Sequence, residues 1–318
     1  MRKNIHIISD AKLIKTKLTE LSSLISLEQL DTLTSHQYSR NSLLAMTKDW
    51  NLYLEFCVAH HITALPSTTD AVRMYLEKLA SERKFATVRR NAVTIGLIHR
   101  ILSQKDPTTN SLVRQTLAEI RLNKNGDAKQ ATPLTLEHIT QYEQIISNDP
   151  SLQEIRDLAI CYVMFECAMK RSELKTLDFD QLCYQTATTL IYLGDSHYSL
   201  SSHAHNALEK WRQFIPENQG IVFRAIDRHG NIANRPLDDS SIYRVVRRVG
   251  EKLGISTTLS GQSVRVGAVK ELVKQGMKAP EIQLFGRWMS PAMPYQYIGN
   301  RVQADAEKIV YKTIKPWD

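Results

Sequence analysis

The feature that most limits the possible folds is a continuous series of short helical patterns between residues 39 and 123. Ser39 is a suitable N-cap for the first helix, in which Trp50, Tyr53 and Leu54 recur at the spacing of a buried helix face. Further helices are expected over residues 71–80, 87–102 and 110–123. The stretch therefore predicts an all-helical domain.

A polar, glycine-bearing and charged segment at residues 123–130 follows this helical series and is the best linker candidate. A chain of 318 residues is too long for one small core, which also favours two domains. Before the series, Leu and Ile recur at helical spacing from Asp10 to Leu33, which predicts one additional helix. The expected organisation is a lead-in over 1–34, a helical domain over 35–124, a linker over 125–134 and a second domain over 135–318.

The second domain is expected to be mainly α, with one small β-sheet. Thr135 is a suitable cap for a helix from Leu136, and a buried helix is expected over residues 155–167. The short apolar, β-rich stretch 188–194 and the segment that begins at Tyr198 predict a hairpin. Helical patterns resume over residues 205–214, 240–253, 264–275, 279–285 and 304–311.

Charge and cysteine content narrow the class of protein. The net charge is +8 and the pI is about 9.2, a balance that suggests a polyanionic partner, with an ordinary basic soluble protein as the alternative. No Cys-x-x-Cys pair occurs, which argues against a zinc ribbon or a redox motif. No signal peptide and no run of eighteen apolar residues is found, so we expect a cytoplasmic protein with no membrane span. All four cysteines are expected to be reduced core residues: Cys57, Cys161, Cys167 and Cys183.

The residues that carry chemistry gather in one block of the second domain. Gln262 and Arg265 are spaced i, i+3, so a helix over this segment places both on one face. Trp288 follows within a Gly-x-Trp triplet, and Tyr297 comes nine residues after it. Tyr295 lies nearby as a competing tyrosine, for which we favour a structural role.

This block resembles the C-terminal block of the tyrosine recombinases, or integrases, and most closely that of the Cre-like proteins. The family pattern is His-x-x-Arg, then Gly-x-Trp or Gly-x-His, then a tyrosine nine residues on, and this chain matches its positions without gaps. Residues 168–174 resemble the family's Arg-x-x-Glu-Leu box, with Glu173 at the acidic position. The helical region 39–123 resembles the family's core-binding (SAM-like) domain, and the likeness covers roughly residues 35–315.

The resemblance implies phosphoryl transfer on double-stranded DNA without metal, ATP or another cofactor. Tyr297 would attack a scissile phosphate and form a 3′-phosphotyrosine, which conserves the bond energy for strand exchange. Arg265, Trp288 and the residue at position 170 would contact the phosphate, and Glu173 would orient these groups. The two domains would hold the duplex as a clamp. The helix over 302–311 would dock on a neighbouring protomer in an assembly of up to four, with packing on its own domain as the alternative.

Three positions depart from the family pattern. Lys170 stands where the family has its first arginine, His197 where it has a hairpin lysine, and Gln262 where it has a histidine. Lys170 keeps the charge but loses the bidentate fork, and Arg171 lies one position further along the predicted helix. His197 can still donate a proton, whereas Gln262 can bind a phosphate oxygen but cannot transfer one.

These departures leave three hypotheses open. The first is a site-specific recombinase that cleaves through Tyr297, with His197 as the acid. The second is a DNA-binding regulator that has kept the fold without cleavage. The third is a protein that works only beside an active partner recombinase in a mixed tetramer.

Two basic clusters are candidates for DNA contact, against the alternative that each is a solvated face. The first leads into the helix of residues 87–102 and places two arginines in its N-terminal turn; the second occupies one face of the helix over 240–253. Their residues are Arg83, Lys84, Arg89 and Arg90, and Arg244, Arg247 and Arg248. His203 and His205 form a His-x-His pair, but nothing at a suitable spacing completes a metal site, so no metal is expected.

Overall fold

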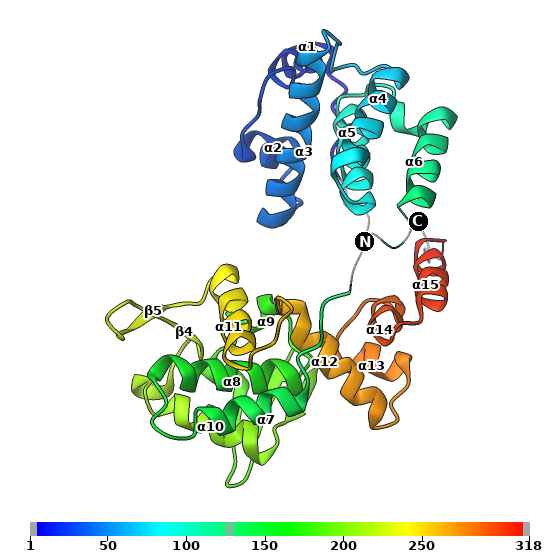
Figure 1. Ribbon diagram of the computed structural model, residues 1–318. Helices are drawn as coiled ribbons and strands as arrows, with labels where there is room; N and C mark the ends of the chain where they lie inside the picture. Colours follow the sequence, from blue (N-terminus) through cyan, green and yellow to red (C-terminus); the bar gives the residue numbers. More distant parts are fainter. Residues whose placement is uncertain (1–4, 125, 127–129, 314–318) are drawn as a thin grey trace. The chain divides into compact units, whose positions relative to one another are not determined.

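The computed structural model describes residues 5–124, 126 and 130–313. The chain divides into two compact units, Met1–Lys129 and Gln130–Asp318 (Figure 1). Both units are mostly helical, as predicted, and two small antiparallel sheets occur among the described residues of the second. No helix in the described part of the chain is long and apolar enough to cross a membrane.

The first unit is an all-helical bundle, which confirms the prediction for residues 39–123. Its core is centred on Trp50 and Tyr53, both fully buried. Ser39 caps its longest helix by accepting a hydrogen bond from the Ser42 backbone, as expected. The elements are α1 (Ala11–Glu20), α2 (Leu27–Leu33), α3 (Arg40–Ala59), α4 (Thr69–Glu82), α5 (Phe85–Ile101), the 3-10 turn η1 (Pro107–Thr109) and α6 (Ser111–Asn123).

Two predictions for this unit were wrong. The single helix expected between Asp10 and Leu33 is two helices, because the chain turns after Leu21 and Ser26 starts α2 with a capping box. Arg89 and Arg90, which were predicted in the N-terminal turn of the helix over 87–102, lie instead in the second turn of that helix. That helix, α5, begins at Phe85, where Lys84 serves as an N-cap without a side-chain hydrogen bond.

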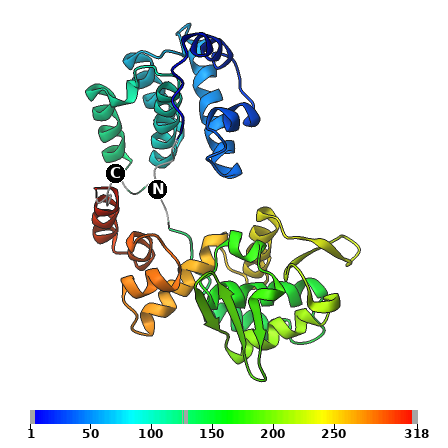
Figure 2. The ribbon, with the colours of Figure 1, turned by 180° about the vertical axis from the view of Figure 1, so that it is seen from behind.

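The second unit is built around α8 (Leu152–Glu166), which is buried along nearly its whole length. It is packed by α7 (Leu136–Ile145), α10 (Ser202–Arg212) and α12 (Gly261–Lys274). Three short strands, β1 (Leu182–Tyr184), β2 (Thr189–Leu193) and β3 (Ser196–Ser199), form one sheet in the order β1-β2-β3. The sheet is drawn as green arrows in Figure 2. The hairpin predicted in this region is confirmed, with Tyr192 paired to His197 and Ile191 to Tyr198.

The elements of the second unit follow in chain order. They are α7 (Leu136–Ile145), α8 (Leu152–Glu166), α9 (Arg171–Lys175), η2 (Phe179–Gln181), β1 (Leu182–Tyr184), β2 (Thr189–Leu193), β3 (Ser196–Ser199), α10 (Ser202–Arg212), η3 (Pro216–Asn218), β4 (Arg224–Ile226), β5 (Ile232–Pro236), α11 (Asp239–Lys252), α12 (Gly261–Lys274), α13 (Ala279–Phe285), α14 (Ala292–Ile298) and α15 (Arg301–Thr313).

Three features of this unit differ from the expectations. The prediction of a single sheet was wrong, because β4 and β5 pair as a second one; their arginine, asparagine and proline residues hide the alternation typical of strands. The helix α14, which carries Tyr297, was missed, since Pro291 and Pro294 argue against a helix there. Cys183 is exposed on β1, whereas the other three cysteines are buried as expected.

The end of the segment expected to be a linker packs on the second unit. The backbone N–H of Leu134 donates to the Ser263 carbonyl at 2.9 Å. The Leu134 carbonyl lies so close to Gly267 that a Cβ there would meet it at 1.7 Å. The Gln130 amide donates to the backbone carbonyl of Tyr297 at 2.7 Å, so this segment also holds α14.

Candidate active site

Helix α12 presents the first functional group. Ser260 and Ser263 form a capping box at its start, and Gln262 is exposed in its first turn. Arg265, one turn further, is half-buried: its guanidinium carbon lies 4.0 Å over the Trp288 ring, and its Nη2 donates to the Gly286 carbonyl at 2.6 Å. Burial lowers the pKa of Arg265 to about 10, although the neighbouring Tyr297 and Glu173 oppose this shift. Its Nε is buried and has no hydrogen-bond partner within the described residues.

Trp288 connects this arginine to the candidate nucleophile. The rings of Trp288 and Tyr297 meet edge to face, with centroids 5.9 Å apart and planes inclined by 76°. Tyr297 is only 5% exposed and packs with Val266, Val269 and Ile282. Burial raises the pKa of the Tyr297 hydroxyl, and the nearby Arg265 charge partly offsets that rise. The structure thus brings together Arg265, Trp288 and Tyr297, three of the predicted site residues.

The turn after α13 places Trp288 where it is. A Cβ on Gly286 would meet the Trp288 ring at 1.8 Å, so the indole folds back over a position that only glycine can occupy. The next residue, Arg287, adopts the left-handed conformation with φ 55°. This strained residue ends the α13 helix and directs both its own side chain and Trp288 into the unit.

Arg287 is a site residue that the sequence interpretation missed. Its Nε and Nη2 donate to the two carboxylate oxygens of Glu173 at 3.1 and 2.7 Å, and it also donates to the Tyr198 hydroxyl and to the Cys167 carbonyl. Its position between Gly286 and Trp288 in the Gly-x-Trp triplet was the available signal. The acid expected to orient catalytic groups, Glu173, therefore acts on the Trp288 turn through Arg287.

Lys170 is the N-cap of α9 and does not lie in the helix itself. Its Nζ pairs with Glu173 Oε1 at 3.1 Å, and its backbone N–H donates to Glu173 Oε2 at 2.8 Å. Burial alone would raise the pKa of Glu173, but the hydrogen bonds from Arg287 and Lys170 outweigh it and lower the pKa to about 2. The placement of Arg171 one position along a helix from Lys170 was wrong, because Arg171 is the first helical residue.

The hairpin residue His197 is exposed on β3, beside Tyr192 at 6.2 Å between ring centroids. Its neighbour Tyr198 points to the opposite face and lies against Phe285, with ring centroids 5.0 Å apart. The hairpin is thus attached to the site through Tyr198. Among the described residues, no contact joins His197 to Arg265, Trp288 or Tyr297.

The two basic clusters differ in how many side chains are free. Arg90 donates to the buried carboxylate of Asp49 at 2.7 and 2.8 Å, and Arg248 donates to the buried carboxylate of Asp157 at 3.0 and 2.5 Å. Both arginines therefore hold their own unit together. The other members of the two clusters are exposed: Arg83, Lys84, Arg89, Arg244 and Arg247. Among them, Arg247 pairs with Glu251 and Arg244 donates to the Ser241 hydroxyl.

Comparison with known proteins identifies the family. The sequence profile of the phage integrase family matches residues 134–303, more than half of the chain. The chain belongs to the phage integrase family. It is 25% identical to an integrase/recombinase XerD homologue of Selenomonas ruminantium, over 94% of this chain and 93% of the relative. It is 20% identical to the Cre recombinase of Escherichia phage P1, over 83% of this chain and 84% of Cre, so the likeness to Cre is distant.

A solved structure supports the fold of this integrase over almost its whole length. The XerH site-specific recombinase bound to palindromic difH substrate, a post-cleavage complex, superposes with a TM-score of 0.63 at 15% identity. The match covers 95% of this chain and 98% of XerH. The predicted family and the mainly helical fold class are confirmed.

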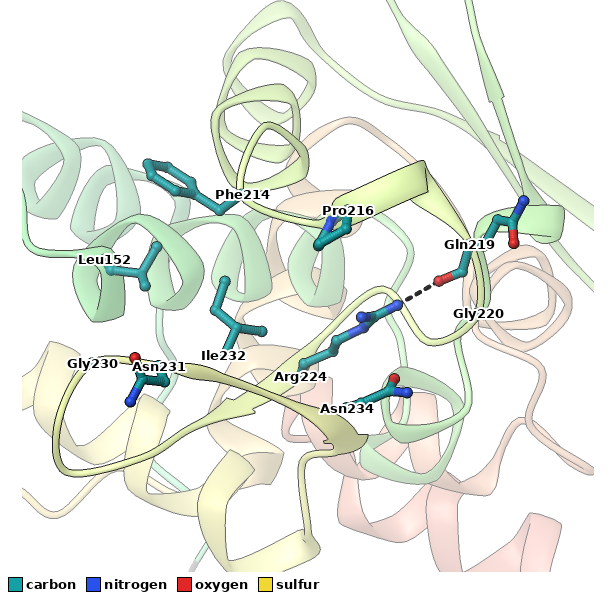
Figure 3. Close-up of a pocket in the computed structure, with 10 residues that line it drawn as sticks. All are labelled: Leu152, Phe214, Pro216, Gln219, Gly220, Arg224, Gly230, Asn231, Ile232 and Asn234. Atoms are coloured by element: carbon teal, nitrogen blue, oxygen red, sulfur yellow. Dashed lines mark hydrogen bonds between the residues drawn. The ribbon is translucent and has the colours of Figure 1, made fainter.

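Two further features of the integrase lie outside the site. His203 contacts Glu143 at 2.9 Å and His205 contacts Thr189 at 2.8 Å, so the His-x-His pair does not converge on one point. A cavity of about 960 Å³ lies beside the β4–β5 hairpin, between Phe214, Ile232 and Asn234 (Figure 3). The Arg224 side chain crosses it but already donates to the carbonyls of Gln219 and Ile221 at 2.5 and 3.1 Å.

Proposed function

We propose that this integrase is a site-specific DNA recombinase that cleaves one strand of duplex DNA through Tyr297. The observation that carries the proposal is the convergence of Arg265, Trp288 and Tyr297, which come from α12, the turn after α13, and α14. A half-buried arginine beside a tyrosine suits a phosphate under attack, because the guanidinium can stabilise the charge on its oxygens.

The chemistry follows from these groups. The Tyr297 oxygen attacks phosphorus and the bond from phosphorus to the 5′ oxygen breaks, which leaves a 3′-phosphotyrosine and a 5′ hydroxyl. The tyrosine proton passes to a base, and the leaving oxygen takes a proton from an acid, for which His197 is the candidate. Arg265 lowers the energy of the charge that grows on the non-bridging oxygens, and Trp288 holds its guanidinium in place. No step requires a metal or a cofactor.

The partner and the assembly are part of the proposal. The XerH complex contains its DNA substrate, and the basic balance of this chain suits the same class of partner. We place Arg83, Lys84, Arg89, Arg244 and Arg247 on the DNA backbone, and the protein in the cytoplasm at the nucleoid. The amphipathic helix α15 is proposed to dock on a neighbouring protomer in an assembly of up to four.

A second candidate function is a DNA-binding regulator that does not cleave. The observations that favour it are the Lys170–Glu173 pair, the exposed His197 away from Arg265, and Gln262, which cannot transfer a proton. Losing proton-transfer help costs about 10²–10⁴ in rate, so several such changes can leave cleavage too slow to be useful.

One experiment separates the two functions. Target DNA is selected from random duplexes by binding to the full chain, and the selected site is rebuilt as a nicked suicide substrate. A recombinase forms a covalent protein–DNA adduct that disappears in Tyr297→Phe and persists in the control Tyr295→Phe. Tight, specific binding without an adduct in the wild-type protein would instead establish the regulator.

A further inference from the structure

Arg171, the first residue of α9, lies across the first turn of α12. A Cβ placed on Gly261 would meet Arg171 Cδ at 2.5 Å, its Nε at 3.0 Å and its Cγ at 3.2 Å. Gly261 is buried and begins an ordinary α-helix, so its backbone conformation does not call for glycine. The missing side chain is therefore what lets the stem of Arg171 pass over the helix.

This approach places the Arg171 stem on the face of α12 that also carries Arg265. Gly261 and Arg265 are spaced i, i+4, so their side-chain positions share a face of α12 about 5–6 Å apart. Gln262 is exposed in the same turn as Gly261. Arg171 is itself exposed, and its Nη1 donates a long hydrogen bond to the Asp239 carbonyl at 3.5 Å.

The neighbouring cation is already engaged. Lys170 Nζ pairs with Glu173 at 3.1 Å, and Glu173 in turn receives both arms of Arg287. A lysine is also a point charge that cannot make the two parallel hydrogen bonds of an arginine fork. Arg171 therefore offers the two-donor guanidinium group that position 170 lacks.

The geometry points to Arg171 as a residue that, with Arg265, binds a DNA phosphate at the Tyr297 site, in place of a fork at position 170. The inference rests on the DNA binding in the proposed function but not on cleavage. The competing role is structural: Arg171 would only brace α9 against α11 and α12.

The test measures binding of a fluorescent random-sequence duplex to the full chain by anisotropy over a series of salt concentrations. Each phosphate contact adds about 0.9 to the slope of log K against log salt, so Arg171→Gln should flatten the slope by about that amount. Arg171→Lys keeps the charge and should keep the slope. Lys210→Gln, on exposed α10 surface, removes the same charge elsewhere and should leave the slope unchanged.

A second variant acts on Arg171 without changing it. Gly261→Ala pushes the arginine stem aside, so it should flatten the slope as Arg171→Gln does. The double variant should lose no more than either single variant, because both remove one contact. A slope that Arg171→Gln leaves unchanged, or losses that add in the double variant, would overturn the inference in favour of bracing.

Cleavage provides an independent arm. On the suicide substrate selected above, Arg171→Gln should slow adduct formation by about 10²–10³, and by more than Lys170→Gln does. A wild-type protein that binds duplex with the predicted slopes but forms no adduct would refute cleavage and leave the Arg171 contact standing. A wild-type protein that does not bind duplex would overturn both.

Discussion

Arg287 and Glu173, 114 residues apart in the sequence, form a two-armed ion pair, with Nε to Oε1 at 3.1 Å and Nη2 to Oε2 at 2.7 Å. The pair ties the turn that carries Trp288 to the start of α9, where Lys170 also binds Glu173. Both side chains are largely buried, at 15% and 21% exposed. The position of Trp288 over Arg265 therefore depends on a carboxylate that belongs to a different helix.

Removing one partner of this pair should destabilise the second unit. Glu173→Gln leaves the mostly buried Arg287 without its counter-charge, and we expect a loss of about 2 kcal/mol in the free energy of unfolding. Urea titration of the full chain, with hydrogen exchange followed in peptides from residues 155–175, measures it. The matched control is Glu251→Gln, which breaks the exposed pair with Arg247 and should cost at most about 0.5 kcal/mol. Equal losses in the two variants would contradict the role of the pair.

The same carboxylate predicts an acid dependence. Folding lowers the pKa of Glu173 from 4.5 to about 2, so its contribution to stability is complete above about pH 4.5 and is lost as the pH falls toward 2. The stability difference between the wild-type protein and Glu173→Gln should therefore be constant near neutral pH and shrink across that acid window. Urea midpoints measured at several pH values test this, and a difference that stays constant down to pH 2 would contradict it.

Gly286→Ala should displace Trp288. The new methyl group would lie 1.8 Å from the indole, so the ring must leave both Arg265 and Tyr297. The displaced Trp288 gains exposure to water, so tryptophan emission should shift to longer wavelength. Trp50 and Trp211 are fully buried and should not contribute to this change. In a Trp288→Phe background the substitution should leave the emission unchanged. An unshifted spectrum in Gly286→Ala alone would show that the turn can absorb the methyl group.

Two adjacent arginines should behave differently. Arg90→Ala removes the counter-charge of Asp49, which is 2% exposed and keeps a hydrogen bond from Asn91, and should destabilise the first unit by about 2 kcal/mol. Arg89 is exposed, so Arg89→Ala should change stability by less than about 0.5 kcal/mol. If Arg89 contacts DNA as proposed, its loss should flatten the salt slope of duplex binding by about 0.9. The expected pattern fails if Arg89→Ala destabilises the unit as much as Arg90→Ala does.

Restoring a proton-transfer group should speed cleavage. Gln262 is exposed in the first turn of α12, on the helix that carries Arg265, so Gln262→His introduces an imidazole without disturbing the core. Proton-transfer catalysis contributes about 10²–10⁴, and we expect at least the lower end of this range in the rate of adduct formation. Gln262→Asn serves as the control that changes the side chain without adding a titratable group. An equal rate in all three proteins would place the limiting step elsewhere.

Motif spacing was sufficient to select Arg265, Trp288 and Tyr297, because the family pattern has fixed intervals between these positions and this chain matches them. Helical periodicity likewise predicted most helices, since a buried face imposes its period locally. Where local signals were weak or opposed, prediction failed: the prolines of α14 concealed a helix, and the short β4–β5 pair lacked alternation.

The sequence by itself determined the family, the mainly helical fold and the position of the candidate nucleophile. Only the tertiary structure decided which charges are free. Arg90 and Arg248 are neutralised by buried carboxylates far along the chain, Arg287 is bound to Glu173, and Arg171 is left exposed above Gly261. No local rule separates these arginines, because the partner of a charged side chain depends on which segments the fold brings within a few ångströms of it.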